Sequence, residues 1–305
     1  MITSIKLFSL VAAAFLALSC DEKPTIDVPA PEMPKPVEPN KPSEEGGSGI
    51  EISVMSFNVR YPASGDTGEK AWSYRLKGVK AMLTEKNPDL IGVQECYPSQ
   101  RIDICNAFKQ YDYYGVLRSN GTVGDANSAS ETTTIFYNKE KFELVDKGTF
   151  WLSETPDKAS TGWDATIKRT TTWVLLKEKT SGNQFYFFNT HLDHAGVQAQ
   201  NEGAKLIRAR MESMNKAGLP VLLTGDMNVE QSSNVLLNFK MDNIRKTAPV
   251  TDTKVTCHGY GSKSQRIDHI FYEGFIPHKF ETVNKEWAGM KYISDHNPVM
   301  AVVEF

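Results

Sequence analysis

The sequence predicts an α/β or α+β domain in which sheets pack together and helices cover the outside. Strand-like runs alternate with helix-like runs along residues 50–305. Several strand-like runs, such as 219–224 (LPVLLT), are apolar at every position, and such strands are usually covered on both faces. Residues 50–305 are long enough for one large domain and contain no second Pro/Gly/Ser-rich break.

The individual elements follow from the spacing of apolar and β-branched residues. A helix is predicted over 72–87, where apolar side chains recur at helical intervals and the run stops before a proline. A second helix is predicted over 198–216 for the same periodicity. Strands are predicted in short apolar, β-branched or aromatic runs, at 51–59, 89–95, 132–138, 171–177, 184–192, 219–224, 266–272 and 298–305.

The first 20 residues resemble an export signal rather than part of the fold. Lys6 gives a positive start, and the apolar or small run 7–18 is too short to span a bilayer comfortably. The run ends at Ser19-Cys20, which resembles the lipobox of bacterial lipoproteins, although Ala17 stands where Leu is usual. We expect lipidation of Cys20 and a membrane anchor through that lipid. The alternative is a plain cleaved signal with an ordinary cysteine.

Residues 21–49 predict a disordered, Pro-rich stalk. They hold seven of the 15 prolines and almost no large apolar side chain, so they cannot bury a core and favour extended backbone. At about 3.1 Å per residue the stalk would reach at most on the order of 90 Å. Lipid and stalk together predict an exported domain held on the cell envelope, at its periplasmic or cell-surface face. The alternative is a leader without that purpose.

Charge and cysteine content restrict the possible partners and cross-links. The chain has 34 basic and 37 acidic residues. Residues 1–49 hold four of the basic and seven of the acidic residues, so positive and negative charges balance in the domain. No broad basic field is therefore available for a long polyanion, although a local basic patch stays open.

Cys96, Cys105 and Cys257 cannot all pair within one chain. Cys96 and Cys105 either pair or are small buried thiols.

Six polar motifs lie where predicted strands end or begin. On strand-like backbone, positions i and i+2 point the same way, so Asp226 and Asn228 aim together beyond their strand. Each motif alone has a simpler explanation, such as a turn capped by Asn58. Strand ends on one rim of a sheet are nevertheless where ligands gather, so together they predict one site. The motifs are SFNVR (56–60), VQE (93–95), NTHLDH (189–194), GDMN (225–228), RIDHI (266–270) and SDHNPV (294–299).

This ordered set resembles the DNase-I-like endonuclease/exonuclease/phosphatase superfamily, and NTHLDH with its following helix resembles a bacterial secreted subgroup. The resemblance covers nearly all of residues 50–305, and GDMN and SDHNPV are its most diagnostic parts. It implies a four-layer α/β sandwich, with two mixed sheets face to face and helices outside. It also implies a hydrolase that cleaves phosphoester bonds with a divalent metal, usually Mg²⁺, for which Mn²⁺ can substitute.

The resemblance further implies a metal site and a general base. Phosphoester cleavage needs a cation to neutralise the phosphate and a base to activate water, and Mg²⁺ prefers oxygen ligands. Glu95 is the expected main metal ligand, with Asn58 and Asp295 nearby. His296 is the expected base, and Asp268 would orient it as a carboxylate orients an imidazole.

Three further residues complete the catalytic set by the same resemblance. Asp226 would position or deprotonate the attacking water, and Asn228 would hold a phosphate oxygen. His191 would donate a hydrogen bond to a phosphate oxygen in the transition state. The division between base and acid roles stays open within the family.

Substrate-binding residues are predicted at four positions. Arg60 stands where DNA-repair relatives commonly carry an acid or Asn, which favours phosphate contact over metal binding and argues against an abasic-site endonuclease. Arg169 is a second candidate phosphate contact, with a solvated surface arginine as the alternative. Asp193 and His194 are assigned to substrate binding from the NTHLDH motif. His258 and His278 lie outside the motifs, and we assign them surface or packing roles.

Two other classes of protein compete with a phosphoesterase, whose substrate could be nucleic acid, a phospholipid such as sphingomyelin, or a small phosphorylated molecule. A non-catalytic envelope binding protein that kept the fold should have lost an acid or base of the site, yet none is lost. A zinc hydrolase built on His191 and His194 lacks a clear third ligand. We expect a monomer.

Overall fold

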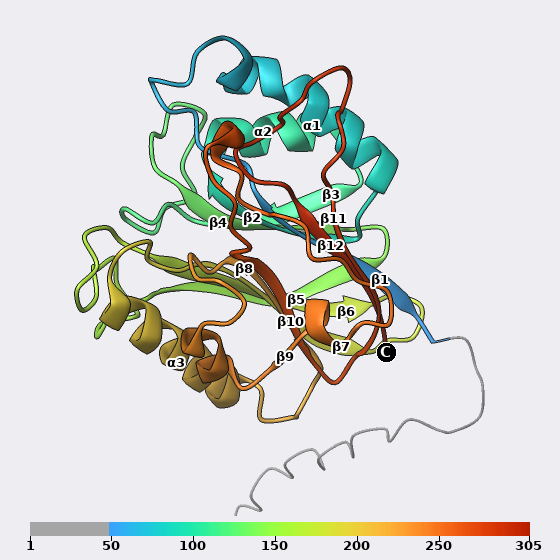
Figure 1. Ribbon diagram of the computed structural model, residues 1–305. Coiled ribbons are helices and arrows are strands. Elements are labelled where there is room, and N and C mark those ends of the chain that lie inside the picture. The colour runs from blue at the N-terminus through green and yellow to red at the C-terminus, as the bar shows by residue number, and fades with distance from the viewer. Residues whose placement is uncertain (1–48) are drawn as a thin grey trace, which may run out of the picture. The chain divides into compact units, whose positions relative to one another are not determined.

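The computed structural model describes residues 49–305, and the predicted signal, Cys20 and nearly all of the predicted stalk lie outside these residues. Two six-stranded sheets lie face to face (Figure 1). The first has the order β11-β12-β1-β2-β4-β3 and comprises β1 (Glu51–Asn58), β2 (Leu90–Cys96), β3 (Tyr111–Tyr114), β4 (Thr132–Asn138), β11 (Ile276–Thr282) and β12 (Val299–Glu304). The second has the order β5-β6-β7-β8-β10-β9 and comprises β5 (Phe142–Trp151), β6 (Thr170–Glu178), β7 (Gln184–His191), β8 (Val221–Asp226), β9 (Asp242–Asn243) and β10 (Asp268–Glu273).

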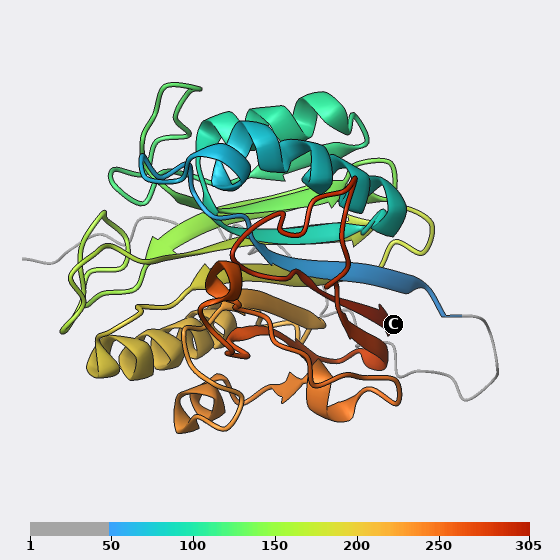
Figure 2. The same ribbon diagram turned by 45° about the horizontal axis from the view of Figure 1, so that its top comes forward.

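Helices form the outer layers (Figure 2). Helices α1 (Trp72–Lys86) and α2 (Pro98–Ala107) cover the first sheet, and α3 (Val197–Met214) covers the second. Both sheets are mixed, because β1–β2 and β7–β8 pair in parallel while the other neighbours are antiparallel. The shorter helical segments are α4 (Ile244–Thr247), η1 (Gly68–Lys70), η2 (Asn234–Phe239) and η3 (Gly259–Gly261). The predicted four-layer sandwich is confirmed.

Three apolar clusters explain why the interior strands are apolar throughout. In β1, Ile52 and Val54 point into the cluster between the sheets, whereas Met55 and Phe57 point into the cluster beneath α1 and α2. A third cluster lies between the second sheet and α3. Because side chains alternate along a strand, a strand covered on both faces needs apolar residues at consecutive positions.

Polar side chains also join the two sheets inside the sandwich. The Asn189 amide on β7 donates to the carbonyl oxygens of Val93 and Thr134 in the first sheet, at 2.9 and 3.0 Å. Its Oδ1 accepts from Gln94 Nε2 at 2.7 Å and from Thr224 Oγ1 at 3.1 Å. All four hydrogen bonds are buried. This network fixes the position of one sheet relative to the other just behind the strand ends.

The two predicted helices are confirmed as α1 and α3, and each of the eight predicted strands overlaps a strand of the structure. The strands that the sequence pattern did not predict are β3, β5, β9 and β11, which are the edges of the two sheets. Edge strands are commonly short or polar, and β5 has exposed or half-exposed side chains at most positions. Helix α2 was also not predicted.

Cys96, Cys105 and Cys257 are free thiols. No helix within residues 49–305 is long and apolar enough to cross a membrane.

Candidate active site

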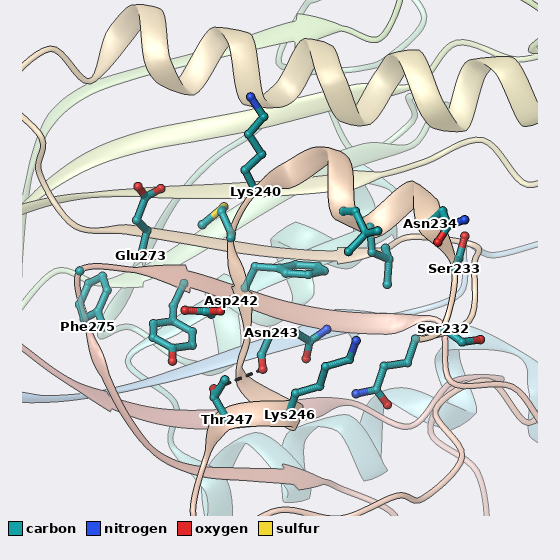
Figure 3. Close-up of a pocket in the computed structure, with 17 residues that line it drawn as sticks. Ser232, Ser233, Asn234, Lys240, Asp242, Asn243, Lys246, Thr247, Glu273 and Phe275 are labelled. Atoms are coloured by element: carbon teal, nitrogen blue, oxygen red, sulfur yellow. Dashed lines mark hydrogen bonds between the residues drawn. The ribbon is translucent and has the colours of Figure 1, made fainter.

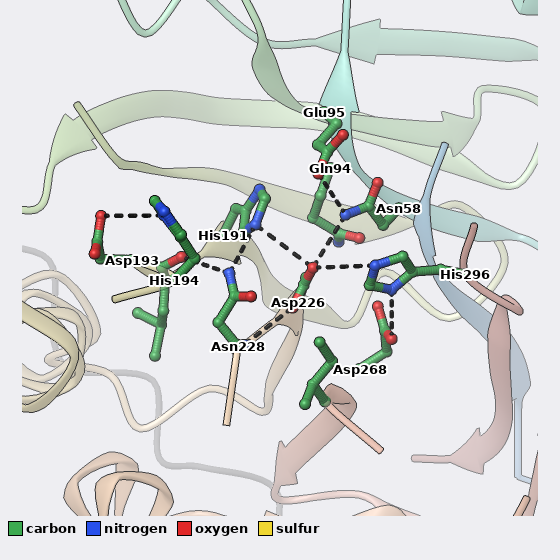
Figure 4. Close-up of polar contacts among 12 residues, drawn as sticks. Asn58, Gln94, Glu95, His191, Asp193, His194, Asp226, Asn228, Asp268 and His296 are labelled. Atoms are coloured by element: carbon green, nitrogen blue, oxygen red, sulfur yellow. Dashed lines mark hydrogen bonds and ion pairs between the residues drawn. The ribbon is translucent and has the colours of Figure 1, made fainter. Parts of the chain in front are cut away.

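The predicted motifs meet at one rim of the sandwich (Figure 4). In the first sheet β1 ends at Asn58, and Glu95 is the penultimate residue of its parallel neighbour β2. In the second sheet the parallel strands β7 and β8 end at His191 and Asp226. Strand β10 runs antiparallel to β8 and begins with Asp268 opposite Asp226. Five strands therefore deliver side chains from two sheets to one place.

Asn58 links the acids of the two sheets. Its Nδ2 lies 3.1 Å from Glu95 Oε1 and 3.0 Å from Asp226 Oδ2. Its Oδ1 accepts from the backbone N–H of Arg60 at 3.0 Å, and the other oxygen of Glu95 accepts from the N–H of Tyr61 at 3.3 Å. In this structure the amide nitrogen of Asn58, rather than its oxygen, faces the carboxylates.

A histidine and two aspartates form a buried line across the site. His296 Nδ1 lies 2.9 Å from Asp268 Oδ2, and its Nε2 lies 3.8 Å from Asp226 Oδ2. Burial works against the charged imidazolium, but the carboxylates of Asp268 and Asp226 outweigh burial and raise the pKa of His296 well above its ordinary value. Burial and the nearby Asp268 raise the pKa of Asp226 to about 7. The protonation of His296 and that of Asp226 therefore depend on each other.

His191 has the opposite electrostatic environment. Burial, followed by the positive charges of Arg169 and Arg118, lowers its pKa well below the usual value. The amide of Asn228 lies 3.0 Å from His191 Nε2, an arrangement in which that nitrogen accepts and the ring proton is on Nδ1. His191 Nε2 also lies 3.5 Å from Asp226 Oδ2. A neutral imidazole at this place can donate a hydrogen bond without adding charge to the site.

Backbone strain marks three of the predicted site residues. Arg60, Glu95 and Asn228 have φ angles of 58°, 57° and 53°, a left-handed conformation that non-glycine residues seldom adopt. Each such residue costs on the order of 1–3 kcal/mol and persists where the surroundings impose it. Asn228 is held by its backbone N–H, 3.0 Å from Asp226 Oδ1, and by its amide, 3.0 Å from the carbonyl of Leu192.

Arg169 is 5 % exposed, so it is not a solvated surface arginine. Its Nη2 lies 3.2 Å from His194 Nδ1, and its Nε lies 3.6 Å from Asp193 Oδ2 without forming a hydrogen bond. Asp193 also accepts from the backbone N–H groups of Ala195 and Gly196, so it shapes the turn that leads into α3. The side chain of His194 is 54 % exposed.

Two site residues without a motif lie beside Arg169. Arg118 Nη1 and Glu131 Oε2 form an ion pair of 2.6 Å. Burial outweighs the positive charge of Arg118 and raises the pKa of Glu131 to about 7. Both residues line a small cavity together with Glu95, Arg169 and His191. No sequence signal pointed to them, because Arg118 lies in a loop and Glu131 directly precedes β4.

Arg60 lies near the carboxylates of both Glu95 and Asp295. Arg60 Nε lies 2.9 Å from Asp66 Oδ2. Burial lowers the pKa of Arg60, but this hydrogen bond and the carboxylates of Asp295 and Glu95 hold it above its usual value. The carbonyl oxygen of Asp295 accepts from the backbone N–H groups of His258 and Gly259 at 3.0 Å each. His258, which the sequence placed in a surface or packing role, therefore lies against the site.

One group of described side chains lies close enough together to hold a divalent cation. Asp226, Asp268 and His296 are buried, with ligand atoms within 4.8 Å of one another. Their polar atoms, however, already engage one another, including through the 2.9 Å hydrogen bond of His296. Glu95 and Asp295 are half-buried carboxylates that solvent can reach. Oxygen donors of this kind, with room for water, match what Mg²⁺ prefers.

A larger cavity of about 810 Å³ lies away from these groups (Figure 3). It is bordered by η2, β9, α4 and the end of β10, and its charged lining residues are Lys240, Asp242, Lys246 and Glu273. None of the predicted site residues lines it. We therefore place the chemistry at the rim of the strand ends.

A four-layer sandwich with paired acids and a histidine–aspartate pair at one rim defines the DNase-I-like class of proteins. The chain belongs to the Endonuclease/Exonuclease/phosphatase family, whose model matches residues 55–296. This family is metal-dependent and hydrolyses phosphoester bonds. The recognised superfamily is thereby confirmed.

Solved structures agree with this assignment. An endonuclease/exonuclease/phosphatase family protein from Bacteroides thetaiotaomicron is 32% identical, with a TM-score of 0.76 over 84% of this chain and 98% of its own. A mannosyl-6-phosphatase from the same species is also 32% identical, with a TM-score of 0.75 over 83% of this chain and 100% of its own. The human Nocturnin catalytic domain, at 19% identity and a TM-score of 0.65 over 84% and 93% of the two chains, shares the fold.

Proposed function

We propose that this protein is a Mg²⁺-dependent phosphoester hydrolase in which His296 activates the attacking water. The observation that carries the proposal is the buried line Asp268–His296–Asp226, which Asn58 joins to Glu95. A base oriented by one carboxylate and a second acid opposite it are what in-line attack of water on phosphorus needs.

The residues of the chain would divide the work as follows. Asp268 holds the His296 ring through Nδ1, so that Nε2 faces Asp226 and takes the proton of the water. Asp226 positions that water and shares the proton. Asn228 and His191 lie on the far side of Asp226. The Asn228 amide would donate to a phosphate oxygen by giving up its hydrogen bond to His191 Nε2, and the ring proton of His191 would be the second donor.

The cation site fits Glu95 as its main ligand with Asp295 beside it, and Asn58 holds Glu95 in place. A bound Mg²⁺ would neutralise charge on the phosphate and on the leaving oxygen. Arg169 lines a small cavity together with Glu95, and the charge of Glu95 reaches Arg60, so both arginines would provide further positive charge toward a phosphate.

A phosphomonoester is the first substrate to test. One of the 32% identical relatives is a mannosyl-6-phosphatase, which supports a small phosphorylated molecule as the substrate. The balanced charge of the domain does not favour a long polyanion. Phosphodiesters of nucleic acid or of a phospholipid are the alternatives within this activity.

The test is a metal-supplemented activity screen of the full chain. It includes mannose 6-phosphate, an aryl monophosphate, a bis-aryl phosphodiester, DNA, RNA and sphingomyelin. We expect turnover that vanishes in EDTA and returns with Mg²⁺ or Mn²⁺. Full activity in the chelator would overturn the metal assignment. Absence of turnover on every substrate would favour the envelope binding protein.

We further propose that the protein is a monomeric member of the bacterial secreted lipoprotein subgroup. Its support is the sequence alone: the lipobox-like Ser19-Cys20 and the Pro-rich run 21–49. A lipid on Cys20 would anchor the catalytic domain to the cell envelope. Fractionation of cells tests this location, as described in the Discussion.

A further inference from the structure

We propose that a cavity beside Asp295, walled by Tyr260 and Tyr292, binds the sugar ring of a hexose phosphate while its phosphate lies at the catalytic rim. This inference rests on the proposed function and names the substrate class of the same site. The cavity has a volume of about 480 Å³, within the range of pockets that hold small ligands.

The cavity adjoins the catalytic rim, because the charges of Asp295 and Arg60 reach its lining residue Tyr260. Tyr260 follows His258 and Gly259, whose backbone N–H groups donate to the Asp295 carbonyl at 3.0 Å. On the opposite side, the cavity-lining Gly65 precedes Asp66, the ion-pair partner of Arg60. Arg60 is in turn close enough to Asp295 and Glu95 for their charges to act on it. A ring in this cavity would therefore lie next to a phosphate held at Glu95.

An aromatic cluster makes the wall nearest the histidine–aspartate pair. The rings of His258 and Tyr292 are stacked with centroids 4.7 Å apart, and Tyr260 meets Tyr292 edge-on at 5.8 Å. The backbone N–H of Tyr260 donates to His258 Nδ1 at 3.1 Å, which leaves the imidazole proton on Nε2. Tyr260 has a φ of 55°, a conformation that the surrounding turn must impose.

One buried arginine fixes the remaining walls. Arg75, which is 0 % exposed, donates to the carbonyl oxygens of Arg60, Lys70 and Ile293 at 2.7–2.9 Å. The segment 287–293 also packs directly on α1, because a Cβ at Gly78 would lie 2.6 Å from Ile293 Cγ2 and 3.0 Å from Met290 Sδ. The cavity is therefore held in shape before any ligand enters.

The lining chemistry favours a neutral polyhydroxyl ring. Lys70 and Lys291 supply donors, and Glu69 and Glu286 supply acceptors, so hydroxyl groups find both kinds of partner. The same glutamates repel a second phosphate and so disfavour a nucleic acid strand. Among the lining residues, Met290 is the one purely aliphatic side chain, which is too little for a lipid tail.

Two lysines that lie over the tyrosine rings can move aside for a sugar ring. Lys70 Nζ lies over the Tyr260 ring at 4.9 Å and Lys291 Nζ over the Tyr292 ring at 5.1 Å. Both lysines are exposed, so their flexible stems can move aside at little cost. The C–H face of a sugar would then take the position on the aromatic ring that an ammonium group holds here.

The experiment compares two monoesters that both release a primary alcohol. Mannose 6-phosphate has a ring for the cavity, and ethyl phosphate has none. In the Mg²⁺-loaded full chain, Tyr292→Leu should lower kcat/KM for mannose 6-phosphate about tenfold and change that for ethyl phosphate less than twofold. Glu286→Gln, an exposed position, should lower only the mannose 6-phosphate value, by about threefold or more. Tyr272→Leu, which alters a tyrosine of the other cavity, is the matched control and should change neither value.

Several results would overturn the cavity assignment. Equal losses on both substrates would mean that Tyr292 acts through His258 on the catalytic groups. The cavity assignment would also be refuted if Tyr292→Leu lost activity on neither substrate. It would be refuted if the parent protein hydrolysed other phosphoesters but not mannose 6-phosphate, or if it preferred thymidine 5′-phosphate.

Direct binding separates this inference from the proposed function. Mannose is titrated into the metal-free protein and followed by NMR line shifts, a readout that needs no catalysis. We expect millimolar binding to the parent and to Tyr272→Leu, and at least tenfold weaker binding to Tyr292→Leu. If no phosphoester is hydrolysed but mannose binds in this pattern, the proposed function fails and the cavity assignment holds. Absence of mannose binding by the parent would overturn the cavity assignment whatever the activity.

Discussion

His296 Nδ1 lies 2.9 Å from Asp268 Oδ2, and this contact joins the segment before β12 in one sheet to the first residue of β10 in the other. Both residues are buried. The pair orients the imidazole ring, so that its other nitrogen faces Asp226. Removing either partner should therefore affect the rate far more than the fold.

His296→Ala should reduce kcat by about 10²- to 10⁴-fold, the usual range for loss of a positioned proton transfer. Asp268→Asn should reduce kcat by less, because it orients and stabilises the ring without taking the proton. The two losses should not add, since the residues act as one unit. Steady-state kinetics of the two single variants and the double variant measure this. A double variant whose log-rate loss equals the sum of the single losses would contradict the coupled pair.

The pH profile gives the same pair a second test. A base works when it is unprotonated, so kcat/KM should rise as pH rises through its pKa. Because Asp268 and Asp226 overcome burial and raise the pKa of His296, the low-pH limb should lie above the ordinary histidine value of about 6.5. If a residual activity of His296→Ala keeps the same limb, the base is Asp226, whose pKa is raised to about 7.

Glu95→Gln should raise the Mg²⁺ concentration for half-maximal activity about tenfold or more, because a neutral amide is a weaker ligand than a carboxylate. The matched control is Glu140→Gln, an exposed acid in the turn between β4 and β5, which should leave the Mg²⁺ dependence unchanged. Activity titrations with Mg²⁺ after EDTA treatment measure the effect. An unchanged Mg²⁺ requirement in Glu95→Gln would move the cation to the group Asp226, Asp268 and His296.

Asn189→Ala should lower the free energy of unfolding by about 2–4 kcal/mol, because the buried partners of its amide lose their hydrogen bonds. Denaturant unfolding followed by circular dichroism measures this change. Asn183→Ala, an exposed residue in the turn before β7, serves as the control and should stay within about 0.5 kcal/mol of the parent. A loss at Asn189 no larger than the control would show that the network between the sheets contributes little.

His269 should make the protein less stable in acid. Burial lowers the pKa of His269 to about 4, so the folded protein keeps this ring neutral while the unfolded chain protonates it below about 6.5. The native state then binds fewer protons, and the stability from His269 is lost as pH falls from about 6.5 to 4, by up to roughly 3 kcal/mol.

Unfolding curves between pH 4 and 7 test that effect. His269→Asn should flatten the pH dependence of the unfolding free energy in this window. His278→Asn is the matched control, because it makes the same exchange at a histidine on β11 whose side chain is 37 % exposed, and it should change the slope less than His269→Asn does. An unaltered slope in His269→Asn would assign the acid sensitivity to another buried group such as His191.

Cys20→Ser should release the protein from the membrane fraction, because a lipid on this cysteine is the proposed anchor. Immunoblots of soluble and membrane fractions measure the distribution. Ser19→Ala, which keeps a small residue before the cysteine, should leave the protein in the membrane fraction. Membrane binding that persists in Cys20→Ser would mean that another part of the chain carries the attachment.

The sequence by itself predicted the interior of the fold and most of the polar residues that gather at one rim of the sandwich. Strands such as β1 and β8 are covered on both faces, so they need apolar side chains at consecutive positions, and this pattern is visible in the sequence. The polar residues that end them stand out against this background, which is why Asp226, Asn228, Asp268 and His296 were found as motifs. The edge strands were not predicted, because a strand at an exposed edge does not need consecutive apolar residues.

Tertiary structure alone decided which of these groups meet, and at what distance. Asn58 and Asp226 are 168 positions apart in the chain, and only the packing of one sheet on the other brings them to 3.0 Å. Arg118 and Glu131 reach the site from segments without a motif. The same packing places His258 against Asp295, whereas the sequence analysis had assigned it only a surface or packing role. Local periodicity reports whether a residue is buried, whereas the distance between two strand ends depends on how whole layers pack.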